Sequence, residues 1–152
     1  ILISYSEHDK KIQIKKNLDP NLAQLIIDPE QIRRVLINLF ENATDAIEEG
    51  GTIQISTKIL DGKKWVRIEF SDNGAGISSS DREKLFLPHF TTKKRGTGLG
   101  LAIVNRIIID HNGTIKVQDN VPKGTTFIID LPYSQTTLKT NKTLPKSFSD
   151  IS

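Results

Sequence analysis

Two asparagines one helical turn apart are the residues of this chain best suited to chemistry. Asn38 and Asn42 are four positions apart, so a helix would place their side chains on one face. Each offers a neutral carbonyl oxygen, a hard ligand that suits Mg²⁺ and leaves the charge of the ion free for phosphate oxygens. Asn42 is the better metal candidate, while Asn38 could reach the ion or a phosphate. The alternative is that both are solvated positions on an amphipathic helix.

A loop with two glycines begins at Asp72. Gly74 and Gly76 would let its backbone turn sharply and approach a flat ligand closely. An ionised Asp72 suits the exocyclic amino group of adenine, whereas guanine presents a carbonyl at the corresponding place. The same residues would also make a plain Asx turn with no ligand.

A second glycine cluster, Gly96, Gly98 and Gly100, brackets the predicted start of a helix over about 99–110. Free backbone N–H groups and the positive end of the dipole attract anions there. The preceding stretch, about 88–98, reads as a mobile loop with hydroxyl groups and positive charge for a triphosphate: Thr91, Thr92, Lys93, Lys94 and Arg95. Charged loop residues are usually only solvated. A third glycine turn, at 124–126, is ordinary by itself.

A helix must position the asparagines, and its start is well marked. Asp28 can cap, Pro29 suits the first helical position, and Gln31 completes a capping box. A helical apolar stripe runs from Ile32 to Ile47, and Gly50-Gly51 is expected to end the helix. One polar edge of this helix would carry Asn38, Asn42 and Asp45, with Glu41 beside them.

Alternating patterns predict strands at about 53–59 and 66–70, with Asp61-Gly62 as a hairpin turn. Further strands are expected at 11–15, 22–27, 114–118 and 125–131, and a short helix at about 80–86. Asn112-Gly113 would stop the helix over 99–110. Segregated helices and a mixed, mainly antiparallel sheet give the α+β class, as a two-layer sandwich.

Composition sets broad limits. With 152 residues, 36% of them hydrophobic, the chain is expected to form one domain. A net charge of +3 does not argue for a nucleic-acid or membrane partner, and the absence of cysteine excludes disulfides. No apolar run approaches a membrane span and no leader is visible, so a soluble, cytoplasmic chain is expected, although the parent protein could be membrane-anchored. From Ser134 onward the polar composition predicts a flexible tail.

Taken together, these segments resemble the catalytic ATP-binding domain of bacterial sensor histidine kinases. This domain belongs to the wider superfamily that includes gyrase, ninety-kilodalton heat-shock chaperones and the MutL repair proteins. Residues 32–47 are similar to its Asn-containing box, 72–77 to its adenine-binding glycine box and 86–90 to its Phe box. Residues 96–101 and 124–127 resemble its second and third glycine boxes. The run 88–93 looks most like the nitrogen-sensor subgroup. The resemblance covers about 10–132 and implies the Bergerat-type ATP-binding fold.

The resemblance implies a site for ATP and Mg²⁺. Asn42 would coordinate the metal, Asn38 would support the metal and phosphate site, Asp72 would bind the adenine amino group, and about 88–98 would be the ATP lid. The catalytic candidates are Asn38, Asn42 and Glu41, the last as a possible aid to proton movement. The residues implied in nucleotide binding are Asn38, Asn42, Asp45, Asp72, Gly74, Gly76, Ile77, Phe90, Thr91, Thr92, Lys93, Arg95, Gly96, Thr97, Gly98, Leu99, Gly100, Leu101 and Thr126.

Two departures from relatives bear on mechanism. Gyrase-like ATPases place a glutamate general base where this chain has Asn38, and its absence fits an enzyme that passes the γ-phosphoryl to a protein nucleophile instead of water. Many kinases of the broader family carry a lysine where Asp45 stands, so a phosphate contact from that lysine has no counterpart here.

The phosphoacceptor is expected outside this chain. His8 is rejected because no Arg and Pro follow it at the family's spacing and it lies too close to Asn42. His89 and His111 are expected to be structural. The resemblance therefore implies residues 1–10 as a linker, 11–133 as the catalytic domain and 134–152 as the tail. The implied partners are an upstream histidine-bearing dimerisation domain and a downstream response regulator; the chain alone would be monomeric and the full kinase dimeric.

Two other functions compete with histidine kinase activity. An anti-sigma-type serine kinase shares the fold but typically keeps the acidic residue that Asn38 replaces. A nucleotide-gated binding module would bind ATP and close its lid without ever transferring phosphate.

Overall fold

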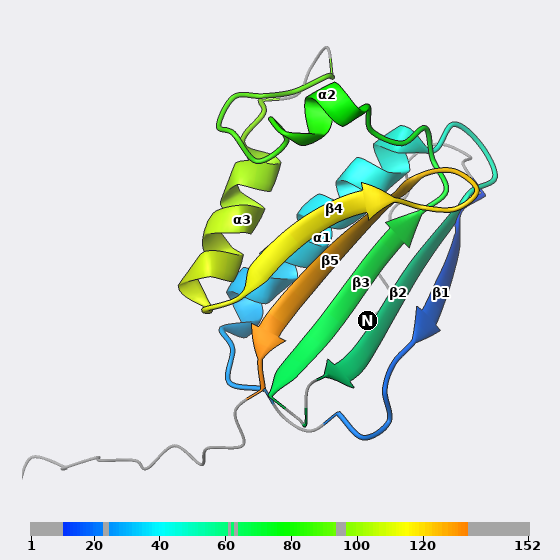
Figure 1. Ribbon diagram of the computed structural model, residues 1–152. Coiled ribbons are helices and arrows are strands. Elements are labelled where there is room, and N and C mark those ends of the chain that lie inside the picture. Colours follow the sequence, from blue (N-terminus) through cyan, green and yellow to red (C-terminus); the bar gives the residue numbers. More distant parts are fainter. Residues whose placement is uncertain (1–10, 23–24, 61, 63, 94–96, 134–152) are drawn as a thin grey trace, which may run out of the picture.

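The computed structural model describes residues 11–22, 25–60, 62, 64–93 and 97–133. Five strands form one sheet in the order β1-β2-β3-β5-β4, with β1 parallel to β2 and the other neighbours antiparallel. Helices α1 and α3 lie against one face of the sheet, and α2 lies at its end (Figure 1). The predicted α+β sandwich with a mixed, mainly antiparallel sheet is confirmed. The elements are β1 (Gln13–Asn17), α1 (Pro29–Ala46), β2 (Thr52–Leu60), β3 (Trp65–Asp72), α2 (Ser79–Arg82), α3 (Gly100–Asp110), β4 (Thr114–Asp119) and β5 (Thr125–Pro132).

Helix α1 begins as the sequence predicts. The Asp28 carboxylate accepts from the backbone N–H groups of Glu30 and Gln31, at 3.0 and 3.2 Å. Four apolar side chains at helical spacing are buried against the sheet: Ile32, Val35, Leu39 and Ala43. These contacts fix the helix so that its polar edge, with the two asparagines, faces the end of the sheet near α2.

The end of α1 differs from the prediction. The helix stops at Ala46, four residues before the predicted Gly50, and Ile47 is already extended with φ −92° and ψ 120°. The physical reason is the contact with the loop after β3: the backbone N–H of Ala75 donates to Ala46 O at 3.0 Å, so this carbonyl bonds the loop and not a further helical turn. The glycine pair still follows the helix, with Gly50 at φ 64°.

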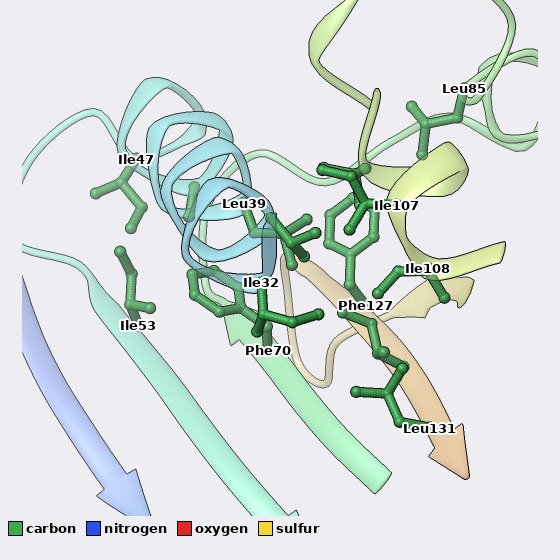
Figure 2. Close-up of a cluster of buried hydrophobic side chains, with 14 residues drawn as sticks. Ile32, Leu39, Ile47, Ile53, Phe70, Leu85, Ile107, Ile108, Phe127 and Leu131 are labelled. Carbon is green, nitrogen blue, oxygen red and sulfur yellow. The ribbon is translucent and has the colours of Figure 1, made fainter. Parts of the chain in front are cut away.

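Alternation along the strands divides the sheet into two faces. Ile53, Phe70 and Phe127 point toward the helices (Figure 2), and together with Ile129 they join the core with α1 and α3. The opposite face is polar and includes a bidentate pair in which Arg67 donates to Asp130 at 2.8 Å through two nitrogens. The core thus lies on one side of the sheet only, as expected for two layers.

Two other boundary predictions need correction. Of the segment 22–27, Leu22 and residues 25–27 are described and none is in a strand. The short helix predicted over 80–86 is one turn at 79–82, capped by Ser78, and continues as turns to the Phe box. Leu85 in those turns is 9% exposed and joins the core, so burial of its apolar side chain does not require a longer helix.

His111 joins the two long helices. Its Nε2 accepts from the backbone N–H of Asp28 at 3.0 Å, and its Nδ1 lies 2.7 Å from Ile107 O. In the predicted capping box, the Gln31 side chain would accept from the backbone N–H of Asp28. In the structure the imidazole of His111, at the end of α3, accepts from it instead. The prediction that His111 is structural agrees with this geometry.

Several sequence predictions lie outside the described residues: the linker over 1–10 with His8, Asp61 of the hairpin turn, Lys94, Arg95 and Gly96 of the lid, and the tail over 134–152. Within the described part of the chain, no helix has the length and apolar character needed to cross a bilayer.

Candidate nucleotide-binding site

A cleft of about 500 Å³ opens where β3 ends, between the polar edge of α1, the start of α3 and the lid. Phe127 on the inward face of β5 lines it, and so does Leu85 from the turns after α2. The described residues that line it are Asn38, Glu41, Asn42, Asp45, Ala46, Asp72, Ala75, Gly76, Ile77, Ser78, Asp81, Leu85, Phe90, Thr91, Thr92, Lys93, Thr97, Gly98, Gly100, Leu101, Thr125 and Phe127.

Asp72 stands at the buried end of this cleft. It is 4% exposed, and its Oδ1 accepts from the backbone N–H of Gly74 at 2.8 Å. Burial raises the pKa of the Asp72 carboxyl, while hydrogen bonds from the backbone N–H groups of Gly74 and Thr125 act in the opposite direction. The result is a shielded acceptor held in one orientation by the backbone around it.

Glycines allow the Asp72 loop to pack closely on its neighbours. A Cβ at Gly74 would lie 2.6 Å from Ala46 O, and one at Gly124 only 2.0 Å from Asp72 O. Asn120 donates its Nδ2 to the same Asp72 carbonyl at 2.8 Å. The first and third glycine clusters therefore fix the backbone on both sides of the carboxylate.

The Asn38 carboxamide uses one of its two N–H donors on α1 itself. Its Nδ2 donates to Arg34 O, one turn earlier on α1, at 2.9 Å. Its Oδ1 points toward the start of α3, where a Cβ added at Gly100 would lie 2.7 Å from it. At this position α1 therefore presents a carboxamide oxygen, and not a carboxylate that could accept a proton.

Asn42 and Asp45 are bonded to the lid. Lys93 Nζ donates to Asn42 Oδ1 at 2.9 Å and forms an ion pair with Asp45 Oδ2. Asn42 Oδ1 therefore lies against a positive charge, as an acceptor oxygen can. Among the described residues, no group of three or more His, Cys, Asp or Glu could hold a metal without further ligands.

Backbone contacts join the two ends of the segment predicted as the lid. The N–H of His89 donates to Gly98 O at 3.0 Å, and a Cβ at Gly98 would lie 2.4 Å from the His89 carbonyl carbon. Both residues have positive φ, 66° for His89 and 69° for Gly98. His89 therefore has a structural place at the neck of the lid, in line with its predicted role.

The start of α3 faces the same cleft. Gly100 and Leu101 line it, and the N-cap residue Leu99 makes no side-chain capping bond. The first N–H groups of a helix have no intrahelical partner, so this end offers donors and a positive dipole to an anion.

Most of the residues predicted for the site come together here, although ligand contact itself stays a prediction. Three do not line the cleft: Gly74 packs on Ala46, Leu99 is 37% exposed beside α3, and Thr126 points to the other face of the sheet. Thr126 instead bonds Ser71 through their hydroxyl groups at 2.9 Å. Arg95 and Gly96 lie outside the described residues.

The cleft also contains residues that the sequence reasoning did not select: Ala46, Ala75, Ser78, Asp81, Leu85, Thr125 and Phe127. Strand alternation could have found Thr125. It shares a face with Phe127, whose apolar ring has to enter the core, whereas Thr126 has the opposite orientation.

Residues 27–135 match the family described as histidine kinase-, DNA gyrase B- and HSP90-like ATPase. The chain belongs to this ATPase family. The fold and the family assignment agree.

Sensor histidine kinases are among the relatives of this ATPase domain. It is 37% identical over 135 residues to the sensor histidine kinase ZraS of Escherichia coli K12. The aligned residues are 89% of this chain and 29% of ZraS. The catalytic domain of the histidine kinase ThkA matches with a TM-score of 0.72 and 37% identity, over 81% of this chain and 80% of that domain. ThkA in complex with the response regulator TrrA matches with a TM-score of 0.68 and 33% identity, over 81% of this chain and 34% of ThkA. The chain thus spans about a third of ZraS.

Proposed function

We propose that this domain binds Mg·ATP and donates the γ-phosphoryl group to a histidine on a separate dimerisation domain, as the catalytic part of a sensor histidine kinase. One observation carries the proposal: a single cleft holds a buried carboxylate, Asp72, at one end and the carbonyl oxygens of Asn38 and Asn42 on α1. The similarity to ZraS and to the ThkA catalytic domain supports the same class of activity.

Each part of the cleft would have a distinct task. Asp72, shielded from water, would accept from the adenine amino group and would repel the carbonyl that guanine presents there. Asn42 would bind the metal through its Oδ1, with Asn38 Oδ1 beside it, and phosphate oxygens would complete the coordination. Bound Mg²⁺ supplies positive charge to the phosphates. The uncapped start of α3 would donate N–H groups to the phosphates.

The proposed transfer needs no base at Asn38. The bond from the γ-phosphorus to its bridging oxygen breaks as a bond to an imidazole nitrogen forms, and ADP leaves with that oxygen and its electron pair. Positioning and charge neutralisation supply most of the catalysis in such reactions. Glu41 lines the cleft and remains a candidate for assisting proton movement. A carboxamide at position 38 would keep water from being activated against ATP.

The partners follow from the same proposal. Residues 11–133 would form the catalytic domain, joined through residues 1–10 to an upstream dimerisation domain that carries the histidine. A response regulator would receive the phosphoryl group, which the ThkA complex with TrrA makes a natural expectation. With ATP and such a regulator as its partners, the domain would work in the cytoplasm.

Binding is the first test. Isothermal titration calorimetry should show Mg·ATP binding with a clear preference over Mg·GTP. Asn42→Asp should weaken that binding by about 1 to 3 kcal/mol, the range for a hydrogen bond involving a charged group. Gln31→Glu makes the same amide-to-acid change on α1 outside the cleft lining and should leave the affinity unaltered. Equal affinities for the two variants would remove the role given to Asn42.

Transfer is the second test. The domain is mixed in trans with the dimerisation domain encoded upstream and γ-labelled ATP. Acid-labile phosphohistidine is expected. Acid-stable phosphoserine on a partner would favour the serine kinase, and tight binding with no transfer would favour the nucleotide-gated module.

A further inference from the structure

Lys93 of the lid contacts α1 at the proposed metal ligand, Asn42. Lys93 Nζ donates to Asn42 Oδ1 at 2.9 Å and pairs with Asp45 Oδ2. The side chains of Lys93 and Asp45 are 41% and 56% exposed, so the pair is neither buried nor fully solvated. A positive charge from the lid therefore occupies the oxygen that would bind Mg²⁺.

The geometry of α1 makes this double contact possible. Asn42 and Asp45 are three residues apart on the helix, so their side chains lie on neighbouring positions of one face. One ammonium group can reach both oxygens, because it carries three donors. Asn42 alone offers a neutral oxygen, whereas Asp45 offers a full opposite charge. Of the two contacts, the one to Asp45 is expected to hold Lys93 in place.

The lid backbone is arranged to present Lys93. Its base is fixed by the His89 N–H bond to Gly98 O at 3.0 Å. Inside the loop, Thr91 Oγ1 accepts from the Lys93 backbone N–H at 3.0 Å, which makes a local turn. One backbone bond thus joins the two ends of the lid, and another makes a turn inside it. Among the described lid residues, Lys93 is the one that bonds α1 on the far side of the cleft.

We propose that Asp45 is a positioning residue that holds Lys93 as a latch across the cleft, on the oxygen ligand reserved for the metal. Entry of a metal–nucleotide must break the bond from Lys93 to Asn42, so the latch competes with binding. The proposal rests on the proposed function in naming Asn42 Oδ1 as the metal ligand and Mg·ATP as the competitor.

Whether Asp45 orders the lid through Lys93 can be tested without nucleotide. Backbone ¹⁵N relaxation of the free domain should show lower order parameters for Thr92 and Lys93 in Asp45→Ala than in the natural chain. Glu49→Ala is the control, because it removes an equal charge from an exposed position beyond the end of α1. Unchanged lid order in Asp45→Ala would overturn the latch, whether or not the domain binds ATP.

The competition is tested by a double-mutant cycle with Lys93→Met, using calorimetry with Mg²⁺ and a non-hydrolysable ATP analogue. A latch predicts that Asp45→Ala tightens binding about two- to fivefold when Lys93 is present, the range for a partly exposed ion pair, and less when it is absent. Simple repulsion between Asp45 and phosphate predicts the reverse, because Lys93 screens that charge.

The outcomes separate the two proposals. A larger effect of Asp45→Ala in the Lys93→Met background, or none in either background, would overturn the latch. No binding of Mg·ATP by the natural chain would defeat the proposed function, while the relaxation measurement would still decide whether Asp45 orders the lid.

Discussion

The carbonyl oxygen of Asp72 occupies the place that a side chain on Gly124 would need. A Cβ at Gly124 would lie 2.0 Å from that oxygen and 2.7 Å from the Cα of Asn73. Both neighbours are backbone atoms at the end of β3, so neither can move aside cheaply. The turn before β5 and the Asp72 end of the cleft are therefore built as one unit.

Gly124→Ala should for this reason destabilise the domain strongly. The φ of 110° is unfavourable for alanine and the steric clash adds to it, so a loss of about 2 to 4 kcal/mol in the free energy of unfolding is expected. Gly62→Ala is the matched control, because φ there is 61° but nothing lies within 4 Å of an added Cβ. It should cost only about 1 to 2 kcal/mol. Equal losses in urea denaturation would show that the Asp72 contact carries no weight.

Asp72→Asn should separate binding from stability. Loss of the carboxylate should weaken Mg·ATP binding by about 1 to 3 kcal/mol in calorimetry. The folded protein without ligand should not be weakened at neutral pH, because burial of the charged carboxyl raises its pKa above the ordinary value of 3.8. The natural Asp72 would then lower the free energy of unfolding of the domain, which is common where function requires a buried charge.

The pH dependence of this difference has a definite sign. A raised pKa in the folded state means that the carboxyl contributes stability below its unfolded value, and that this contribution is lost as the pH rises through the folded value. The free energy of unfolding of Asp72→Asn relative to the natural chain should therefore increase from about pH 3.5 toward neutrality, starting near the ordinary pKa. Urea titrations across this range provide the measurement. A difference that stays flat, or falls with pH, would contradict the role of burial.

Local signals in the sequence predicted much of this fold. Asp28 and Pro29 mark the start of α1, and the alternating strands fall where β2, β3 and β5 are found. Alternation would also have placed Thr125 in the cleft, yet similarity to the third glycine box drew attention to Thr126. A motif shows which segment is near a ligand, whereas the pleat decides which side chains of that segment face it.

Contacts between segments far apart in the chain could not be predicted from the sequence patterns. Lys93 and Asn42 are 51 residues apart, and Asp28 and His111 are 83 apart. Neither pair has a local signature, because each arises only when α1, α3 and the lid are packed together. The end of α1 was misjudged for the same reason, since Ala46 O bonds the loop after β3.

His111→Leu should loosen the connection between α1 and α3. The Asp28 N–H would lose its acceptor, and a loss of about 1 kcal/mol in the free energy of unfolding is expected, since this end of the helix is partly open to water. His111→Gln keeps a side-chain acceptor and should recover part of the loss. Thermal or urea unfolding of both variants provides the comparison, and a stability of His111→Leu equal to that of the natural chain would argue against the connection.

Gly100→Ala should impair binding while leaving the fold intact. An added Cβ would lie 2.7 Å from Asn38 Oδ1, which is the free end of a side chain and can move, whereas the nearest backbone does not interfere. Alanine is also a better helix former than glycine, so the free energy of unfolding should stay level or rise by up to about 1 kcal/mol. The displaced Asn38 oxygen should weaken Mg·ATP binding by about 1 kcal/mol or more. Calorimetry beside urea unfolding distinguishes the cases: normal affinity in a folded Gly100→Ala variant would mean that the position of Asn38 Oδ1 does not matter for the nucleotide.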